Sequence, residues 1–413
     1  MSYHFKFSLR PLTSNSSPAW IDCHVSHSPI LRASAPCMLV IGRHTTNIRA
    51  RKFDSGILHN FFDYQPHKTR SKHVFSSWDG PVIKVADPLF NLEAIPITTV
   101  VATLQPHPQS PTLTITTKFH TVQFDVETAP HTSSGYVGLV KETWKRQHTL
   151  DELVGPKYCF QHSYVPHSTP TPIIDQCGHV ISVLAGHPDN PNWEALHLDT
   201  ANTLERLCPE CKLSDEQRKH QRGCNLAFLR LASFASSAFA MWAPRTFAYY
   251  AQHLRDLLMH DMTLIINWVN SVFATMTFNF GPRTLCFRHT NSGNLPFGWC
   301  TITVLGCFNP CLGGHLALWD LKLIIDFPPG SMILIPSAIL WHSNTAISKG
   351  ERRYSFTQYS SGGIFRWVNY GFQSSEEYWG GLVGEDLVQA QKEQSERWKM
   401  GLGLFSTLDE LRL

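Results

Sequence analysis

The stretch AILWHSNTAISKGERRYSFTQY, residues 338–359, consists of two segments rich in β-branched and aromatic residues, separated by a turn that contains Gly350. The first segment carries His342, and the second carries Arg353 and Ser355. Because the side chains of a strand alternate between its two faces, Arg353 and Ser355 point to the same face. A guanidinium beside a hydroxyl can hold a carboxylate through paired hydrogen bonds. The stretch therefore predicts two strands that carry a histidine and a carboxylate-binding pair.

The same pattern continues on both sides of this stretch, from residue 277 to residue 372. Short segments with Gly or Pro at their corners are typical of strands. There are eight of them: TFNFGP, TLCFRH, GWCTITVLG, HLALWD, KLIIDFPPGS, MILIPS, AILWHSN and RRYSFTQY. Eight closely spaced short strands favour a double-sheet jelly roll, also called a double-stranded β-helix.

The chain before this core has a different pattern of apolar and polar residues. Residues 80–127 alternate β-branched and polar residues between Pro-containing breaks, which predicts further strands. Apolar residues then recur at helical spacing over 192–207, 226–242 and 246–274, with Pro244 between the last two. The expected fold class is therefore α+β, with a jelly-roll core, N-terminal strands and a helical support layer.

The segment RHTNSGN, residues 288–294, indicates a metal site. An iron(II) dioxygenase holds its metal with two imidazoles and one carboxylate, and leaves positions open for oxygen and a cosubstrate. His289 and Asn291 have the spacing of the first histidine and the carboxylate in such a site, and His342 follows on a later strand. His289, Asn291 and His342 are the candidate catalytic and metal-binding residues. Asn291 stands where a carboxylate is needed.

Residues 279–368, from NFGPRTLCFRHTNSGN to GGIFRWV, resemble the 2-oxoglutarate/Fe(II) dioxygenase-like proteins of mushroom-forming fungi. That group is related to the TET and J-binding-protein oxygenases, which oxidise methyl groups on pyrimidine bases. The resemblance is close over residues 265–372 and looser over the preceding helices. It implies Fe(II) and 2-oxoglutarate as cofactors, and DNA or RNA bearing a methylated base as partner. By the same resemblance, His289 and His342 would bind the metal, while Arg353 and Ser355 would bind 2-oxoglutarate.

Asn291 departs from this family pattern, which has His-x-Asp at this position. A neutral amide oxygen supplies only a dipole to a divalent metal, so weaker metal binding is expected. Three interpretations stay open: an inactive copy, a protein that holds iron with a water or substrate at the third position, and a site completed by another carboxylate. Asp320 and Asp326 are the alternatives for the last, but they lie in strands well past the turn. The competing function is a catalytically inactive, mobile-element-derived binding or scaffold protein.

Composition limits the remaining function classes. The chain has 413 residues, 43% of them hydrophobic, which is enough for a sizeable core. A formal charge of +3 permits nucleic acid binding without indicating it. Eleven scattered cysteines and the lack of a signal-peptide-like run favour a reduced intracellular protein, with a nuclear location preferred over a cytoplasmic one. The apolar window 225–244 contains Arg230 and several serines, so a packed helix is expected there rather than a membrane span.

Four regions are expected along the chain. Residues 1–75 form a poorly ordered basic extension, and residues 76–264 supply strands and helices that support the barrel. Residues 265–372 form the dioxygenase-like core. Residues 373–413 carry a charged amphipathic helix on the outside.

Two further metal candidates receive less weight. Cys208, Cys211, His220 and Cys224 have zinc-like content, but the His-x-x-x-Cys half has an unusual spacing, so free thiols in a solvated loop are the competing interpretation. His315 opens a strand after a glycine turn and is expected to hydrogen-bond near the pocket mouth rather than bind metal.

Overall fold

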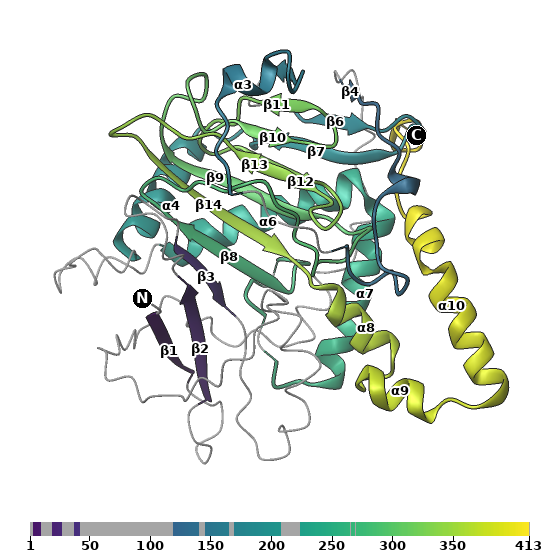
Figure 1. Ribbon diagram of the computed structural model, residues 1–413. Helices are drawn as coiled ribbons and strands as arrows, with labels where there is room; N and C mark the ends of the chain where they lie inside the picture. The colour runs from purple at the N-terminus through teal and green to yellow at the C-terminus, as the bar shows by residue number, and fades with distance from the viewer. Residues whose placement is uncertain are drawn as a thin grey trace, which may run out of the picture.

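The computed structural model describes residues 3–9, 19–26, 37–41, 119–139, 145–164, 169–207, 224–264, 266–268 and 270–412. Within these residues the protein is a mixed α+β structure with a sheet of ten strands and a sheet of four (Figure 1). The large sheet has the order β1-β2-β3-β8-β14-β9-β12-β7-β6-β4, and the small sheet has the order β13-β10-β11-β5.

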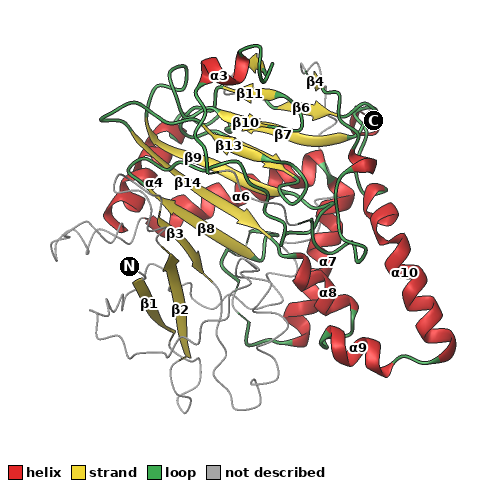
Figure 2. Ribbon diagram, viewed as in Figure 1, coloured by secondary structure: helices red, strands yellow, loops and turns green. Residues whose placement is uncertain are grey.

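The described strands have the following bounds: β1 (Tyr3–Leu9), β2 (Ala19–Ser26), β3 (Cys37–Ile41), β4 (His120–Thr121), β5 (Gln161–Ser163), β6 (Thr171–Ile174), β7 (Val180–Gly186), β8 (Thr275–Phe280), β9 (Cys300–Cys307), β10 (Leu316–Leu318), β11 (Leu323–Ile325), β12 (Met332–Ile335), β13 (His342–Asn344) and β14 (Arg352–Tyr359). The α-helices are α3 (Leu150–Val154), α4 (Trp193–Leu207), α6 (Cys224–Trp242), α7 (Pro244–His260), α8 (Gly362–Asn369), α9 (Ser375–Gly381) and α10 (Gly384–Leu402). Short 3-10 helices span η2 (Val126–Thr128) and η4 (Glu410–Arg412). In Figure 2 the helices lie behind the large sheet and along one edge of the molecule.

The core between residues 275 and 359 is built from nested antiparallel pairs. β8 pairs with β14, β9 pairs with β12, and β10 pairs with β11. A single bridge between His289 and His342 stands where a fourth pair would lie. Outer strands thus pair with outer strands and inner with inner, while alternate pairs fall in opposite sheets. This arrangement is compatible with a jelly-roll-like core.

Seven of the eight strand segments predicted in the core are strands, and TLCFRH is the exception. Its backbone makes isolated bridges at its two ends. Arg283, just before it, bridges Arg353 in the large sheet, and His289, its last residue, bridges His342 in the small sheet. A segment that passes from one sheet to the other cannot form a continuous ladder with either. Periodicity alone does not reveal such a crossing.

The two faces of β14 have different surroundings. Tyr354 and Phe356 are buried in a cluster with side chains of α4 and α6, including Trp193 and Phe228. Period-two alternation therefore turns Arg353, like Ser355, away from these helices. Arg353 and Ser355 consequently face the space between the two sheets.

The predicted helical layer is present, with one boundary changed. α4 and α6 match the helical spacing, and the apolar window 225–244 is a packed helix with Leu231, Ala235 and Phe239 fully buried. None of the described helices is both long and apolar enough to cross a membrane. The helix expected to run to residue 274 ends at His260, because the Asp261 carboxylate accepts hydrogen bonds from the backbone and hydroxyl of Thr263 and favours a turn.

The C-terminal region contains two helices, α9 and α10, where one was predicted. Gly380 and Gly381 weaken the helix, and Gly384 adopts a positive φ of 57° at the start of the next one. Most of the predicted strands in 80–127, as well as the candidate zinc residues Cys208, Cys211 and His220, lie outside the described residues. Of the basic extension, the structure describes β1, β2 and β3, and β3 pairs with β8. The division at residues 75, 264 and 372 stays a prediction.

The turn of PPGS at 328–331 depends on Gly330. Its φ is +84°, and a Cβ there would lie 2.6 Å from the His197 ring. We expect Gly330→Ala to lower the free energy of unfolding by about 2 kcal/mol, since a left-handed alanine alone costs about 1–2 kcal/mol. Gly350→Ala is the matched control, because Gly350 has a φ of +90° with nothing within 4 Å of its Cβ position. Urea unfolding that gives equal losses for the two variants would contradict a role for the His197 contact.

Candidate functional site

His289 and His342 lie next to each other on facing chain segments. Each backbone N–H donates to the other residue's carbonyl, at 3.1 Å from His289 and 2.9 Å from His342. Their ring centroids are 4.3 Å apart. His342 is buried and His289 is half-buried. Residues separated by more than fifty positions are therefore brought together as the sequence predicts for two ligands of one metal.

Both rings are held in the tautomer that carries its proton on Nδ1. His289 Nδ1 lies 2.8 Å from the carbonyl oxygen of Phe287, and His342 Nδ1 lies 2.9 Å from that of Leu340. A carbonyl oxygen only accepts, so each Nδ1 carries the proton and each Nε2 presents a lone pair. Burial, together with the neighbouring His289, lowers the pKa of His342 to about 3, which keeps the ring neutral.

Asn291 lies in the turn that follows the histidine bridge. Its backbone N–H donates to the carbonyl of Ser337 at 2.8 Å, and its carbonyl accepts from the N–H of Asn294 at 2.9 Å. These contacts fix the backbone, while Asn291 itself is exposed to solvent. The residue carries a neutral amide two positions after His289, and its role as third ligand stays a prediction.

Arg353 is a buried cation. It is 3% exposed, and its Nε has no hydrogen-bond partner among the described residues. Its Nη1 reaches only the carbonyl of Thr284, at 3.4 Å. Burial lowers the pKa of Arg353 to about 10, so the guanidinium is still charged at neutral pH. No carboxylate of the described residues pairs with it, and a buried charge without a partner is costly. The guanidinium can therefore bind an anion that is not supplied by the described residues.

Cys286 lies near this guanidinium, and Ser355 is on the same face of β14 as Arg353. The Ser355 hydroxyl oxygen accepts a hydrogen bond from the Asn279 amide at 2.8 Å, which leaves its O–H able to donate. Burial raises the pKa of the Cys286 thiol, and the nearby charge of Arg353 opposes part of that rise. The backbone of Cys286 is in turn paired with Asn344, the last residue of the strand that carries His342. One crossing segment thus links the guanidinium and the histidine pair.

The donors present match an Fe(II) and 2-oxoglutarate site in two of its three parts. Two imidazoles present Nε2 lone pairs, and a buried guanidinium with an unpaired Nε shares one face of β14 with a serine hydroxyl. The third part is the amide of Asn291 in place of a carboxylate. These residues fit a weakly bound divalent metal and a dicarboxylate cosubstrate.

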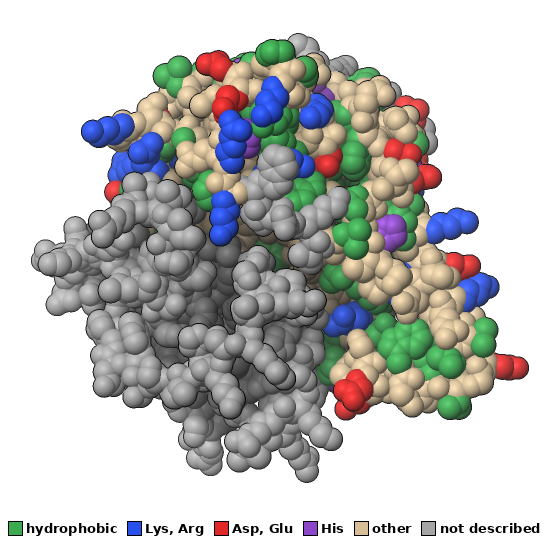
Figure 3. All heavy atoms as spheres, in the orientation of Figure 1, with side chains coloured by type: hydrophobic (Ala, Val, Ile, Leu, Met, Phe, Trp, Pro, Cys, Tyr) green, Lys and Arg blue, Asp and Glu red, His purple; other side chains and the backbone are tan. Residues whose placement is uncertain are grey.

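A cluster of basic and aromatic side chains lies on the outer side of the small sheet, with its aromatic rings buried; we call it the outer aromatic face and define it as Arg288, Trp319, Trp341, Phe160 and Lys322. The Arg288 guanidinium lies 4.7 Å from the Trp319 ring and 4.8 Å from the Trp341 ring. Lys322 lies over Phe160 at 5.3 Å. Figure 3 shows Lys and Arg side chains gathered at the end of the molecule that carries α3, β10 and β11. Arg288 and Trp341 immediately precede the two site histidines in the sequence.

The structure also brings together three side chains that the sequence analysis did not connect. His162, His315 and Asp326 place their ligand atoms within 4.8 Å of one another. From the sequence, His315 is expected to make a hydrogen bond rather than bind a metal. Its Nδ1 does lie 2.8 Å from the Thr345 hydroxyl. His162 belongs to no sequence motif that indicates a metal site. The pairing of β5 with β11 brings it to His315 and Asp326. A cavity of about 470 Å³ elsewhere, lined by residues of α4, β9 and the 328–331 turn, contains none of the predicted site residues.

Comparisons with known proteins do not assign this chain to a family, so its class has to be judged from its own fold and site. No protein-family model and no curated protein matches it. Among solved structures it is similar to NgTET1 in complex with 5mC DNA, with a TM-score of 0.36 and 13% identity over 50% of this chain and 83% of that chain. A TM-score this low carries no argument about the present chain. The protein has a mixed α+β fold with a jelly-roll-like core, a histidine pair and a buried guanidinium.

Proposed function

We propose that the protein is a 2-oxoglutarate/Fe(II)-dependent dioxygenase-like protein of the TET and J-binding-protein type, built on a double-stranded β-helix. The observation that carries the proposal is Arg353, a buried cation without a carboxylate partner among the described residues. A double-stranded β-helix also accounts for the nested strand pairs and for the delivery of His289 and His342 to one place.

Each residue has a distinct task in this proposal. His289 and His342 would hold Fe(II) through Nε2, with the Asn291 amide or a water beside them. Arg353 would take the distal carboxylate of 2-oxoglutarate bidentately, and the Ser355 O–H would donate a third hydrogen bond. With both groups bound, the site would supply oxygen activation for the oxidation of a substrate C–H bond. His342 is itself buried, and the carbonyls of Phe287 and Leu340 keep both imidazoles oriented.

The substrate class that we propose is a methylated base in DNA or RNA. The Lys and Arg side chains at the end of the molecule that carries α3, β10 and β11 support this choice, because cationic side chains attract the phosphates of a nucleic acid strand. Such a partner goes with an intracellular, nuclear location. The exposed Asn291 favours a second candidate, a catalytically inactive binding or scaffold protein that keeps the same fold.

Anaerobic titration with Fe(II) and 2-oxoglutarate tests the proposal. We expect a weak visible charge-transfer band in the purified protein and its loss in His342→Ala. His131→Ala, which changes a histidine stacked on Trp398 elsewhere, serves as the control and should keep the band. Succinate released in air with a methylated oligonucleotide would support the dioxygenase. A band without succinate, or no binding of 2-oxoglutarate at all, would contradict the dioxygenase and support the inactive scaffold.

A further inference from the structure

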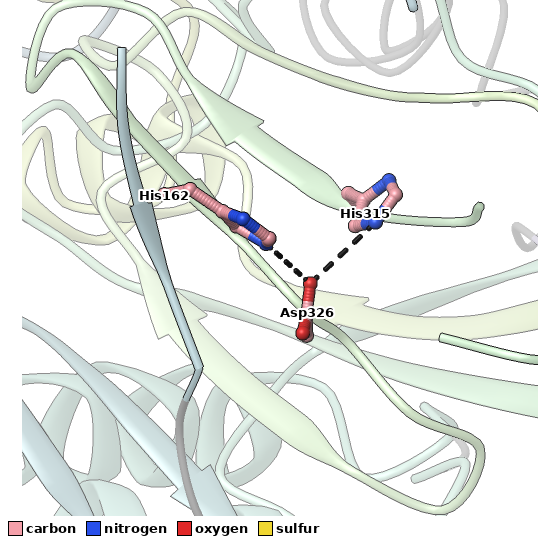
Figure 4. A group of neighbouring side chains, drawn as sticks. All are labelled: His162, His315 and Asp326. Atoms are coloured by element: carbon pink, nitrogen blue, oxygen red, sulfur yellow. Dashed lines mark hydrogen bonds and ion pairs between the residues drawn. The ribbon is translucent and has the colours of Figure 1, made fainter. Parts of the chain in front are cut away.

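Three side chains from separate segments converge beside the small sheet (Figure 4). His162 belongs to β5, His315 directly precedes β10, and Asp326 directly follows β11. His162 Nε2 lies 2.6 Å from Asp326 Oδ1, and His315 Nε2 lies 3.5 Å from the same oxygen. Two imidazoles thus direct the same type of nitrogen at one carboxylate oxygen.

The spacing of these atoms is that of ligands around a metal ion. Metal–nitrogen and metal–oxygen bonds of about 2.0–2.2 Å place neighbouring ligand atoms roughly 3–3.5 Å apart in tetrahedral or octahedral sites. The three ligand atoms here are all within 4.8 Å of one another. A small shift of the Asp326 carboxylate away from His162 would make the distances from Asp326 Oδ1 to the two Nε2 atoms more nearly equal.

The hydrogen bonding of His315 leaves one nitrogen for such an ion. Its Nδ1 contacts the Thr345 hydroxyl at 2.8 Å, which fixes the ring. Its Nε2 is buried and makes no hydrogen bond among the described residues, since 3.5 Å to Asp326 is long and poorly placed for one. An orphaned buried nitrogen directed at a carboxylate is what a metal would satisfy.

The Asp326 carboxylate also needs compensation. It is 5% exposed, and no Lys or Arg of the described residues forms an ion pair with it. Buried carboxylates are normally paired or coordinate a metal. A divalent cation between the two imidazoles would neutralise it.

This cluster is separate from the site of His289 and His342. In the small sheet His342 pairs with Leu318, whose side chain belongs to the interior core with Leu316 and Ile325. Asp326 and His162 alternate with Ile325 and share the side of Ile324, which packs in the outer cluster with Trp319 and Trp341. The two groups of histidines therefore lie on opposite faces of one sheet.

We propose that His162, His315 and Asp326 form a second metal site that binds Zn²⁺, with water at the remaining position. Two imidazoles and a carboxylate form a ligand set that zinc accepts, and the partial exposure of His162 provides an entry path. The ion would fasten β5, a three-residue parallel strand, to β10 and β11 of the core. The proposal does not depend on the proposed dioxygenase function.

Cobalt(II) and zinc(II) titrations of the full chain in a His342→Ala background, which removes the other site, test this proposal. We expect Co²⁺ to give visible d–d absorption that zinc displaces, with one equivalent bound, and an upward shift of Tm on zinc addition. Adding His162→Ala should abolish the absorption and the Tm shift. Adding His120→Ala instead should leave both unchanged, because His120 contacts the neighbouring Ser163 but not Asp326.

His162 is the most exposed of the three residues, with 37% of its side chain accessible, so its alanine variant should fold even where Asp326→Asn does not. Circular dichroism of each metal-free variant checks this. Equal metal binding by the His162→Ala and His120→Ala proteins, or no binding in the parent, would overturn the second site.

Discussion

Arg353→Met is expected to abolish 2-oxoglutarate binding without lowering the stability of the protein in the absence of cofactors. Truncating one member of a buried, hydrogen-bonded charge pair costs about 2–5 kcal/mol, roughly a 30- to 4,000-fold loss of affinity. The free protein behaves differently, because its guanidinium is buried and its Nε makes no hydrogen bond among the described residues. Replacing it by an apolar side chain of similar length removes a desolvation cost, so the free energy of unfolding should stay constant or rise.

Isothermal titration with 2-oxoglutarate and Mn²⁺, together with urea unfolding of the cofactor-free protein, measures both quantities. Arg352→Met is the matched control on the same strand. Arg352 is exposed and pairs with Glu205, so its loss should change stability by less than about 1 kcal/mol and leave the affinity unchanged. A large loss of stability in Arg353→Met with normal 2-oxoglutarate affinity would show that Arg353 is structural, and would remove the main support for the proposed function.

The contrast between Arg353 and His162 shows what the sequence could and could not predict. Arg353 and Ser355 are two residues apart, so strand alternation was enough to place them on one face. Local turn chemistry likewise predicted most strands of the core, because Gly and Pro mark their corners. Asp326 and His162 are 164 positions apart and meet only because β5 joins β11 in parallel. No local pattern encodes such a pairing, and the missed crossing of TLCFRH has the same cause.

That no carboxylate of the described residues pairs with Arg353 was also beyond the sequence. The motif indicates what a guanidinium could bind, but whether an internal Asp or Glu already occupies it depends on the packing of the whole core. That packing gives Arg353 a thiol, Cys286, and a carbonyl, Thr284, as its neighbours. Neither carries a full negative charge at neutral pH. The packing is therefore consistent with the prediction that Arg353 binds the carboxylate of a ligand.

Asn291→Asp is expected to strengthen the binding of Fe(II) or Mn²⁺ by at least about tenfold, equivalent to 1.4 kcal/mol. The backbone of Asn291 is fixed by Ser337 and Asn294, so the substitution adds a charge without moving the turn. A carboxylate attracts a divalent cation by full Coulomb interaction where the amide offers a dipole. The exposure of residue 291 screens part of this attraction and limits the gain. Electron paramagnetic resonance of free Mn²⁺ during titration gives the affinity directly.

Ser292→Asp is the control, because it adds the same charge one residue away in the same turn. If the two variants bind Mn²⁺ equally well, the gain is a general electrostatic effect and residue 291 is not a ligand position. If the parent already binds as tightly as Asn291→Asp, the amide or a water is sufficient at the third position. Adding His342→Ala to Asn291→Asp should return the affinity to that of His342→Ala alone, since a carboxylate and one imidazole form a poor chelate. That result, with succinate formation restored in Asn291→Asp, would mean that the histidine pair and Arg353 still form an oxygenase site in which the loss of one charge suppresses the activity.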